Sequence, residues 1–321
     1  MTRIGFHASH EQFAPGRLLE LAVRAEASGF DAVMCSDHFH PWSHAQGQSG
    51  HAWTWLGAAM SKTGCPYGVV NAPVGRYHPA IIAQAAATLE AMFPGRFWLA
   101  VGSGEALNER IVGGTWPGKP ERNRRLLEAV DVMRALWRGE CVDHQGAFQV
   151  EQAQLFTRPE KPPSIFVAAL SEATAQWGAP WADGLITVSQ SPEKLQPIVD
   201  AFRNNGGANK PVYLQIKLSY ASDEGMALRG AHEQWATNVL DPALSQDIST
   251  PQAYEALAKQ VTPEQVAEIV HVSADTQQHV RWLQTYIDMG FDALYLHNVN
   301  TWQEAFVDTF SHEVIPYLKR R

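Results

Sequence analysis

Short apolar runs alternate with amphipathic stretches along this chain, and the alternation predicts strands separated by helices. The runs that we interpret as strands are residues 3–9, 32–36, 67–71, 97–101, 164–169, 184–188, 211–219 and 293–297. Helical spacing is clearest at residues 15–28, 79–92, 121–137 and 302–318. Strands that alternate with helices pair in parallel through right-handed crossovers, so eight such units predict an α/β fold of the (β/α)8 or TIM barrel type.

A four-residue motif, Gly-Phe-Asp-Ala, occurs at the start of two of the predicted strands, at residues 29–32 and 290–293. In each copy the glycine is placed to end a helix, and the aspartate is placed to begin the turn into a strand. We interpret this repeat as a signature of barrel packing rather than of function.

Three segments are longer than a plain barrel requires, near residues 39–53, 139–163 and 223–270. The second has the turn residues of a hairpin, and the third contains Asp-Ile-Ser-Thr-Pro, which is typical of a helix start. Long insertions in a barrel usually cap its mouth or form subunit contacts. No stretch resembles a linker, so we expect one domain over residues 1–321.

The composition narrows the class of protein. Of the 321 residues, 45% are hydrophobic, which excludes a disordered chain. A net charge of −8 argues against nucleic-acid or anionic-membrane binding, because phosphate recognition requires concentrated Lys and Arg. The three cysteines indicate neither a disulfide framework nor a zinc ribbon. No apolar run approaches the length of a membrane span, and a strand begins almost at the first residue, so we expect a cytoplasmic protein.

Candidate chemistry lies at the carboxyl ends of the predicted strands, where barrel enzymes place their active sites. Asp37-His38 follows the second strand, and an imidazole there can take a proton from an alcohol because it titrates near neutral pH. The alternative is a turn aspartate and a packed histidine. Gly102-Ser103-Gly104-Glu105 follows the fourth strand, and it combines close backbone approach with a carboxyl acid. A barrel turn with a solvated glutamate is the alternative there.

The long loop after the second strand contains two further candidates, an aromatic ring and a pair of histidines that can bind a metal. Trp42 can cover a ligand by stacking, or it can plug the loop. His38-x-His40 can chelate zinc, but a barrel metallohydrolase needs further ligands from later strands, where His297 is the main candidate. The sequence therefore predicts no metal, and a metal-dependent hydrolase is kept as an alternative of another class.

The run from Ser36 to Trp42, Ser-Asp-His-Phe-His-Pro-Trp, resembles a segment of the F420-dependent glucose-6-phosphate dehydrogenases. Residues 8–15, 76–80, 102–109 and 269–275 fit the same proteins in the same order, so the resemblance covers nearly the whole chain. These proteins are similar to the wider luciferase-like flavin and deazaflavin oxidoreductases, which share a (β/α)8 barrel. The resemblance implies hydride transfer between a substrate and FMN or coenzyme F420.

The resemblance also implies a role for individual residues. As catalytic residues it gives the base or proton relay His38, the acid Glu105 and the stacking ring Trp42. As cofactor-binding residues it gives Asp37, Ser103, Gly104, Asn108, Ala168 and Ala169, with Val69, Val70 and Asn71 where the family has a non-proline cis peptide. As substrate-pocket residues we add Glu11, His7 and Gln190.

Departures from the family pattern bear on substrate and cofactor. The sugar-phosphate enzymes hold phosphate with two lysines and an arginine, and the matching positions here are Gln190, Ala256 and Ile269. A dianionic phosphate without cations lacks its partners, so we expect the substrate to be a small neutral alcohol or carbonyl compound and not glucose 6-phosphate. The run Ala168-Ala169-Leu170-Ser171 stands where the relatives have a Gly-Gly pair. A leucine side chain there would narrow the channel for the cofactor tail, which keeps both FMN and F420 open.

The leading hypothesis is therefore a flavin- or F420-dependent oxidoreductase acting on a small-molecule substrate. An FMN-dependent two-component monooxygenase, served by a separate flavin or F420 reductase, is the near alternative, and a non-catalytic flavin-binding protein is a distant one. The relatives indicate a homodimer.

Overall fold

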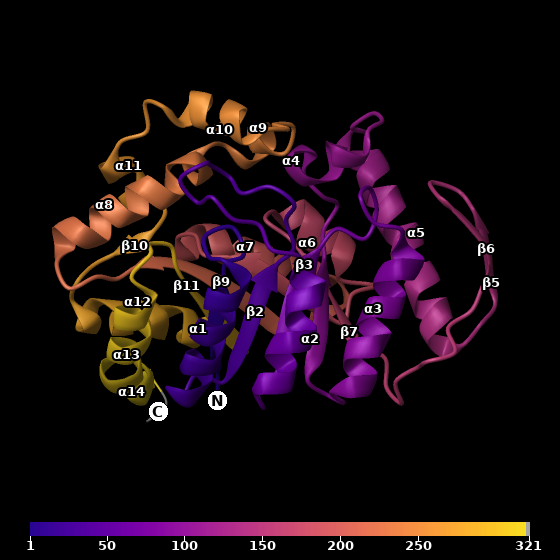
Figure 1. Ribbon diagram of the computed structural model, residues 1–321, viewed down its shortest axis with the longest axis horizontal. Coiled ribbons are helices and arrows are strands. Elements are labelled where there is room, and N and C mark those ends of the chain that lie inside the picture. Colours follow the sequence, from indigo (N-terminus) through magenta and orange to yellow (C-terminus); the bar gives the residue numbers. More distant parts are fainter. Residues whose placement is uncertain (319–321) are drawn as a thin grey trace.

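The computed structural model describes residues 1–318, and its centre is a closed barrel of eight parallel strands (Figure 1). The barrel strands are β1 (Arg3–Ala8), β2 (Ala32–Ser36), β3 (Tyr67–Asn71), β4 (Phe97–Val101), β7 (Ser164–Ala168), β8 (Gly184–Val188), β9 (Val212–Ser219) and β11 (Ala293–Asn298). They pair in chain order, and the ring closes where β11 pairs with β1. The predicted (β/α)8 barrel is confirmed, with strand ends within one residue of the expected ones.

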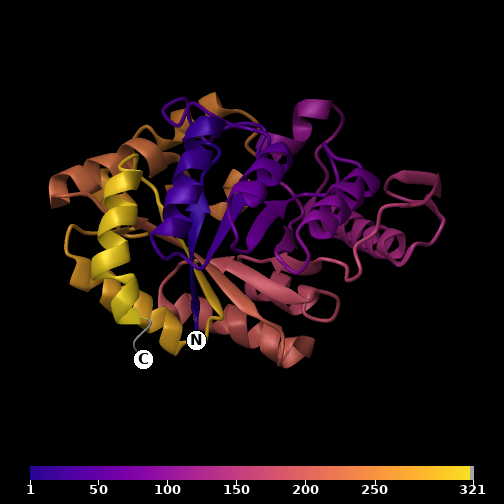
Figure 2. The ribbon, with the colours of Figure 1, turned by 60° about the horizontal axis from the view of Figure 1, so that its bottom comes forward.

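Helices surround the barrel on its outer side (Figures 1 and 2). Those that follow barrel strands are α1 (Pro15–Ala27), α2 (Ala52–Lys62), α3 (Pro79–Met92), α5 (Lys119–Arg138), α6 (Glu172–Gly178), α7 (Pro192–Phe202), α12 (Thr276–Asp288), α13 (Gln303–Glu313) and α14 (Ile315–Leu318). The helix expected at 302–318 is thus divided in two at Val314.

The long segments form additional elements. Residues 139–163 contain an antiparallel hairpin of β5 (Val142–Gln145) and β6 (Gln149–Ala153), which stands away from the barrel in both views (Figures 1 and 2). Residues 223–270 form α8 (Glu224–Trp235), η3 (Ala236–Val239), α9 (Pro242–Ser245), α10 (Pro251–Ala258) and α11 (Pro263–Ala267). A short β10 (His271–Val272) then pairs with β9. In Figure 1 helices α8 to α10 lie at the end of the barrel opposite the amino terminus.

Alternation along the strands divides the core into two parts. Outward-facing side chains such as Val69 pack against the helices, whereas inward-facing ones fill the barrel. The inner part is dominated by the rings of Trp98, Phe166, Tyr213 and Tyr295, whose centroids lie 4.5–5.9 Å apart. Gly68 makes room for Trp98, since a Cβ at this position would lie 1.9 Å from the indole ring. These rings fill the inside of the barrel and leave it open at the carboxyl ends of the strands.

The repeated Gly-Phe-Asp-Ala motif has the structural role that the sequence predicts. Gly29 and Gly290 adopt positive φ angles of 91° and 85° at the helix ends. The carboxylates of Asp31 and Asp292 accept the backbone N–H groups of Ile4 (2.9 Å) and Val212 (2.8 Å) on neighbouring strands. Each aspartate therefore ties the start of one strand to the next.

The expected cis peptide bond near Val69–Asn71 is not found, since every peptide bond in residues 1–318 is trans. Strand β3 keeps regular pairing with β4 through Asn71, so the backbone has no bulge there. No helix within the described part of the chain is long and apolar enough to cross a membrane.

Candidate active site

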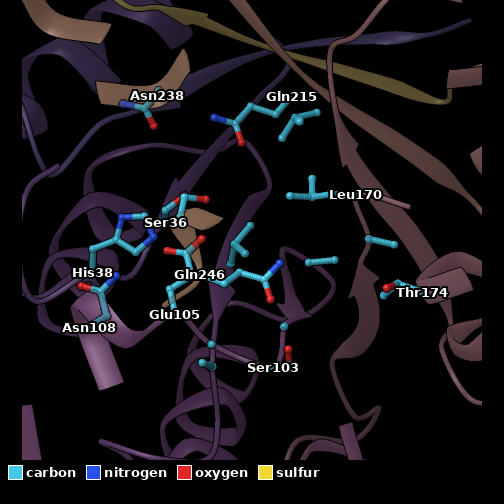
Figure 3. A pocket seen from close by; sticks show the side chains of 18 of the residues that line it. Ser36, His38, Ser103, Glu105, Asn108, Leu170, Thr174, Gln215, Asn238 and Gln246 are labelled. Carbon is cyan, nitrogen blue, oxygen red and sulfur yellow. The ribbon is translucent and has the colours of Figure 1, made fainter. Parts of the chain in front are cut away.

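A cavity of about 980 Å³ opens at the carboxyl ends of the barrel strands. Its walls come from strand ends, from the loop after β2, from α4 (Ala106–Glu109) and α5, and from the 223–270 segment. Figure 3 shows His38 and Glu105 on one side of this space, and Leu170 and Thr174 on the other. The predicted strand-end site and the observed cavity thus coincide.

The floor of the cavity differs from one side of the barrel to the other. On β2, β3 and β7 the last inward-facing side chains are small: Ser36, Val70 and Ala168, with Gly102 directly after β4. On β1, β9 and β11 they are polar: His7, Gln215, Lys217 and His297. The small residues leave a broad shallow surface, and the polar ones form a wall beside it.

His38 forms an ion pair with Glu11, whose carboxylate Oε1 lies 2.5 Å from the imidazole Nδ1. Burial alone lowers the pKa of His38, but the charge and hydrogen bond of Glu11 outweigh it and raise this pKa above the ordinary value. Burial raises the pKa of Glu11, but His38 lowers it further, so the net shift is downward. Each group therefore favours the charged form of the other. With Nδ1 directed at Glu11, Nε2 is the nitrogen left for a ligand.

Glu105 is a second acidic group within electrostatic reach of His38. Burial raises its pKa, and His38 offsets this shift only in part. A carboxyl group with a raised pKa can hold and donate a proton. The structure thus brings together the predicted His38, Glu105 and Glu11.

Trp42 packs beside His38. Its ring lies 5.2 Å from His38 and 5.3 Å from Tyr254 of α10, both in edge-on geometry. Trp42 lines the cavity and also joins a small apolar cluster with Leu107 and Ile248. Both of the alternative roles considered for this ring, ligand cover and loop plug, are thus compatible with its position.

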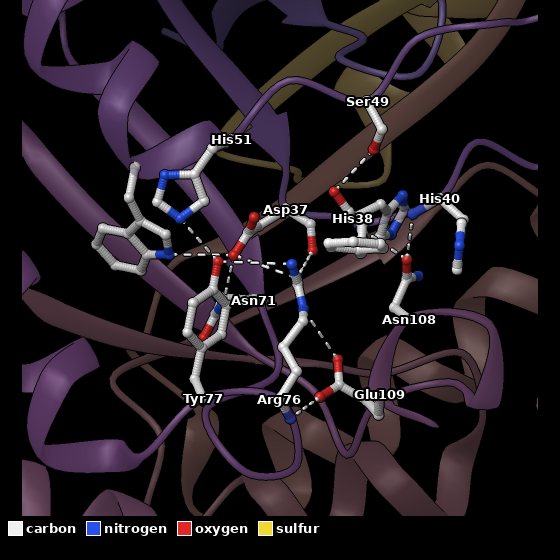
Figure 4. Close-up of polar contacts among 12 residues, drawn as sticks. Asp37, His38, His40, Ser49, His51, Asn71, Arg76, Tyr77, Asn108 and Glu109 are labelled. Atoms are coloured by element: carbon white, nitrogen blue, oxygen red, sulfur yellow. Dashed lines mark hydrogen bonds and ion pairs between the residues drawn. The ribbon is translucent and has the colours of Figure 1, made fainter. Parts of the chain in front are cut away.

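Asp37 is held in a buried polar network (Figure 4). Its Oδ2 accepts hydrogen bonds from Trp53 Nε1 (3.1 Å) and Asn71 Nδ2 (2.8 Å), and Arg76 forms an ion pair with it at 3.3 Å. Arg76 also pairs with Glu109. Asp37 also lines the cavity, and its Oδ1 is buried without a hydrogen-bond partner, so the expected contact with a cofactor ring stays a prediction.

The predicted residues after β4 all line the cavity. Gly104 has φ +79°, and a Cβ there would lie 2.7 Å from the side chain of Glu109, so this turn requires glycine. Ser103 Oγ accepts a hydrogen bond from Lys119 (2.7 Å). The Oδ1 of Asn108 accepts the backbone N–H groups of Phe39 and His40, which leaves its amide nitrogen for a ligand.

Two predicted residues do not line the cavity. Val69 faces outward into the layer between barrel and helices, because side chains alternate along β3 and its neighbour Val70 takes the inward position. Gln190 lies beyond the end of β8, where its backbone carbonyl accepts the hydroxyl of Tyr286 (3.0 Å). Val70, Asn71, Ala168 and Ala169 do border the cavity, although the N–H of Ala169 is taken by Ile186. Ala256 and Ile269 are also absent from its walls.

Several lining residues were not anticipated from the sequence. The cations are Lys119, Arg122 and Lys217, and the others include Gln215, Trp235, Asn238, Gln246 and Tyr254. Most come from α5 and the 223–270 segment, which carry no local motif. Lys217 was missed because a single lysine inside an apolar run gives no signal in the sequence. These three cations were therefore left out of account at the level of the sequence, and the expected neutral substrate stays a prediction.

A metal centre on His38-x-His40 finds no support in the geometry. The Nδ1 of His40 pairs with the backbone carbonyl of Leu107 at 2.8 Å, whereas the Nδ1 of His38 pairs with Glu11. In residues 1–318 no three His, Cys, Asp or Glu side chains gather as metal ligands do.

Comparison with known proteins agrees with this geometry. The model of the luciferase-like monooxygenase family matches residues 1–293. F420-dependent glucose-6-phosphate dehydrogenases of Microbacterium testaceum and Mycobacterium avium are 38% and 36% identical, and each alignment covers 99% of this chain and 98% of the relative.

Solved structures give the same result. An F420-dependent secondary alcohol dehydrogenase in complex with an F420-acetone adduct superposes with a TM-score of 0.91 at 33% identity, over 98% of both chains. The F420-dependent tetrahydromethanopterin reductase from Methanopyrus kandleri, 19% identical over 98% of this chain and 99% of that one, shares the fold with a TM-score of 0.77. The chain therefore belongs to the luciferase-like monooxygenase family.

Proposed function

We propose that this chain is an F420-dependent oxidoreductase that transfers a hydride between the deazaflavin and a small alcohol or carbonyl substrate other than glucose 6-phosphate. The observation that carries the proposal is the grouping of the His38–Glu11 ion pair and the protonatable Glu105 in one cavity at the barrel mouth. The enzyme is an oxidoreductase, and its cofactor is FMN or F420.

The cavity fits a planar redox ring with a phosphate-bearing tail. The small side chains of Ser36, Val70 and Ala168 provide a flat area, which would hold the ring of either cofactor. Lys119 and Arg122 line the same cavity, and the guanidinium Nε of Arg122 is buried without a hydrogen-bond partner. Such cations suit a phosphate, since charge-assisted hydrogen bonds are the stronger ones.

F420 is favoured over FMN by the relatives. Those at 33–38% identity over nearly the whole chain are named as F420-dependent enzymes. Leu170, which the sequence suggested as an obstacle to the longer tail, lies at the cavity wall with 48% of its surface exposed. Its side chain is therefore free to adjust beside a tail that leaves toward solvent.

When bound, the cofactor supplies the hydride acceptor or donor. The residues of this chain manage the proton. His38 in its charged form, which Glu11 favours, donates a proton through Nε2 to the oxygen of a carbonyl substrate as it is reduced, and in its neutral form it removes the proton of an alcohol that is oxidised. Glu105, whose pKa burial raises, would hold a proton more readily than an exposed carboxyl group and would stabilise charge that develops on the bound cofactor. Trp42 excludes water from one side of His38.

Glucose 6-phosphate is disfavoured because the positions that would supply its phosphate-binding cations lie outside the cavity. Gln190, Ala256 and Ile269 are neutral, and none of them lines its walls. The cations that do line the cavity are Lys119 and Arg122, which we assign to the phosphate of the cofactor tail, and the single ammonium group of Lys217.

The test is F420-dependent turnover on a panel of alcohols and carbonyl compounds that includes glucose 6-phosphate. We expect turnover with a substrate other than glucose 6-phosphate, and a loss of about 100-fold or more in kcat for His38→Ala, the range typical of a lost acid–base group. His44→Ala, in the same loop but 63% exposed and outside the cavity, is the matched control. Equal turnover by both variants would exclude the assigned role of His38.

A further inference from the structure

Lys217 occupies an unusual position for a charged residue. It lies on β9, beside His297 of β11 in the strand register, and it borders the cavity. Its backbone N–H donates to Ser189 Oγ (3.0 Å), whereas no charged or hydrogen-bonding partner among the described residues acts on its ammonium group. Burial lowers the pKa of Lys217 to about 8, and no carboxylate contributes to offset it.

The other two cations of the cavity are already engaged. Lys119 donates to Ser103, and Arg122 donates to Pro117 and Gln246. Both also feel the carboxyl group of Glu105. Lys217, itself half-buried, differs from them because its ammonium group has no counter-ion, and a bound anion would supply one.

Neutral histidines separate Lys217 from the catalytic pair. His297 is fixed by Gln215 at Nδ1 (3.3 Å) and Gln12 at Nε2 (3.1 Å), and burial lowers its pKa to about 3. The ring of His7 lies 4.2 Å from that of His297, and burial lowers the pKa of His7 as well. The polar wall of the cavity therefore runs from Lys217 through two uncharged imidazoles to His38.

We propose that Lys217 binds a carboxylate of the substrate, so that the substrates of the proposed oxidoreductase are oxo acids and hydroxy acids. The inference rests on the proposed function for the reacting carbonyl or alcohol, which faces His38 at the other end of this wall. A single ammonium group matches a singly charged carboxylate better than a phosphate dianion. Neighbouring strands lie about 4.8 Å apart, and the wall runs from β9 across β11 and β1 to the end of β2. The carboxylate of the substrate would therefore be several bonds away from the carbon that reacts near His38.

The test compares two probes of the same shape, 4-oxopentanoate and 4-oxopentanamide, by calorimetry with and without F420. Wild-type protein is expected to bind the acid more tightly than the amide. Lys217→Met is expected to weaken binding of the acid by about tenfold or more, equivalent to about 1.4 kcal/mol, and to leave the amide unchanged. Lys62→Met, at the exposed end of α2, is the matched control and should bind both probes as wild type does.

The dependence on pH gives a second readout. The affinity for 4-oxopentanoate should fall as pH rises through about 8, because Lys217 binds the acid only when charged. The groups that face it, His297 and His271, are neutral in this range because burial lowers their pKa to about 3 and about 4. Lys217→Arg should retain binding at high pH, since arginine stays charged.

The outcomes separate this inference from the proposed function. Acid binding that Lys217→Met does not weaken, or no acid binding by wild-type protein, overturns the carboxylate site. Preferential binding of inorganic phosphate that Lys217→Met abolishes also overturns it. Failure of F420 to bind, measured separately by fluorescence quenching, contradicts the proposed function while the apoprotein result for Lys217 still stands.

Discussion

At the scale of single residues, the site is organised by how charges are compensated. His38 has Glu11, and Asp37 has Arg76, whereas Lys217 has no acidic partner. The sequence indicates His38, Glu11 and Glu105 because they lie directly after strands. It cannot show that Arg76 folds back onto Asp37, or that Lys217 faces inward, since both depend on the three-dimensional path of loops and strands.

The His38–Glu11 pair predicts the pH dependence of alcohol oxidation. His38 must be neutral to accept a proton, and Glu11 raises its pKa, so the oxidation rate should rise with pH through that raised value. Glu11→Gln removes the charge and should shift the rising limb of the profile of kcat/KM to lower pH. Glu105 and Arg76 also act on His38 and are unchanged in this variant. A profile that does not move would contradict the assigned coupling.

At the scale of elements, the strands could be located because strands buried on both faces have nearly continuous apolar sequences. The motif Gly-Phe-Asp-Ala could also be interpreted, because its aspartate accepts a hydrogen bond from a backbone N–H at a fixed place in the barrel. The motif Asp-Ile-Ser-Thr-Pro does mark the start of α10, where Thr250 caps the helix, whereas α9, α11 and the two-residue β10 were not resolved from the pattern. Their periodicity is too brief, and tertiary contacts rather than local sequence determine where they end.

Gly68 offers a direct test of the aromatic plug in the lower barrel. Gly68→Ala forces a Cβ into the ring of Trp98, so we expect the free energy of unfolding to fall by about 1–3 kcal/mol. Gly57→Ala, inside α2 with no atom within 4 Å of the new Cβ, should instead raise it by about 0.5–1 kcal/mol. Chemical denaturation of both variants checks this, and effects of the same sign would contradict the packing described.

At the scale of the whole molecule, the insertions form one side of the cavity and are tied to the barrel by buried amides. Gln234 of α8 accepts hydrogen bonds from Gln12 (3.1 Å) and, at its backbone carbonyl, from Gln46 (3.0 Å). Its own amide nitrogen donates to Ala45. Residue 234 thus joins the 223–270 segment to the loop after β2 and to the turn after β1.

Gln234→Ala should loosen this connection without unfolding the barrel. The side chain of Gln12 and the carbonyl of Ala45 lose a hydrogen-bond partner, which lowers the local stability by about 1–3 kcal/mol. We therefore expect faster amide hydrogen exchange in residues 39–53 and 223–270 and unchanged exchange in the barrel strands. Gln284→Ala, which removes an exposed pair with Asp288 on α12, is the control. Uniform acceleration across all strands would show that the insertion and the barrel open together.

The central claim is that a deazaflavin ring lies on the small side chains at the barrel mouth, and an F420 titration with Ala168→Phe tests it most directly. Wild-type protein should quench F420 fluorescence with one site per chain. Ala168→Phe fills the flat area, and it should weaken binding by at least about tenfold, or 1.4 kcal/mol, with an unchanged circular dichroism spectrum. F420 binding of equal strength to both proteins, or no binding to wild-type protein, would contradict the account.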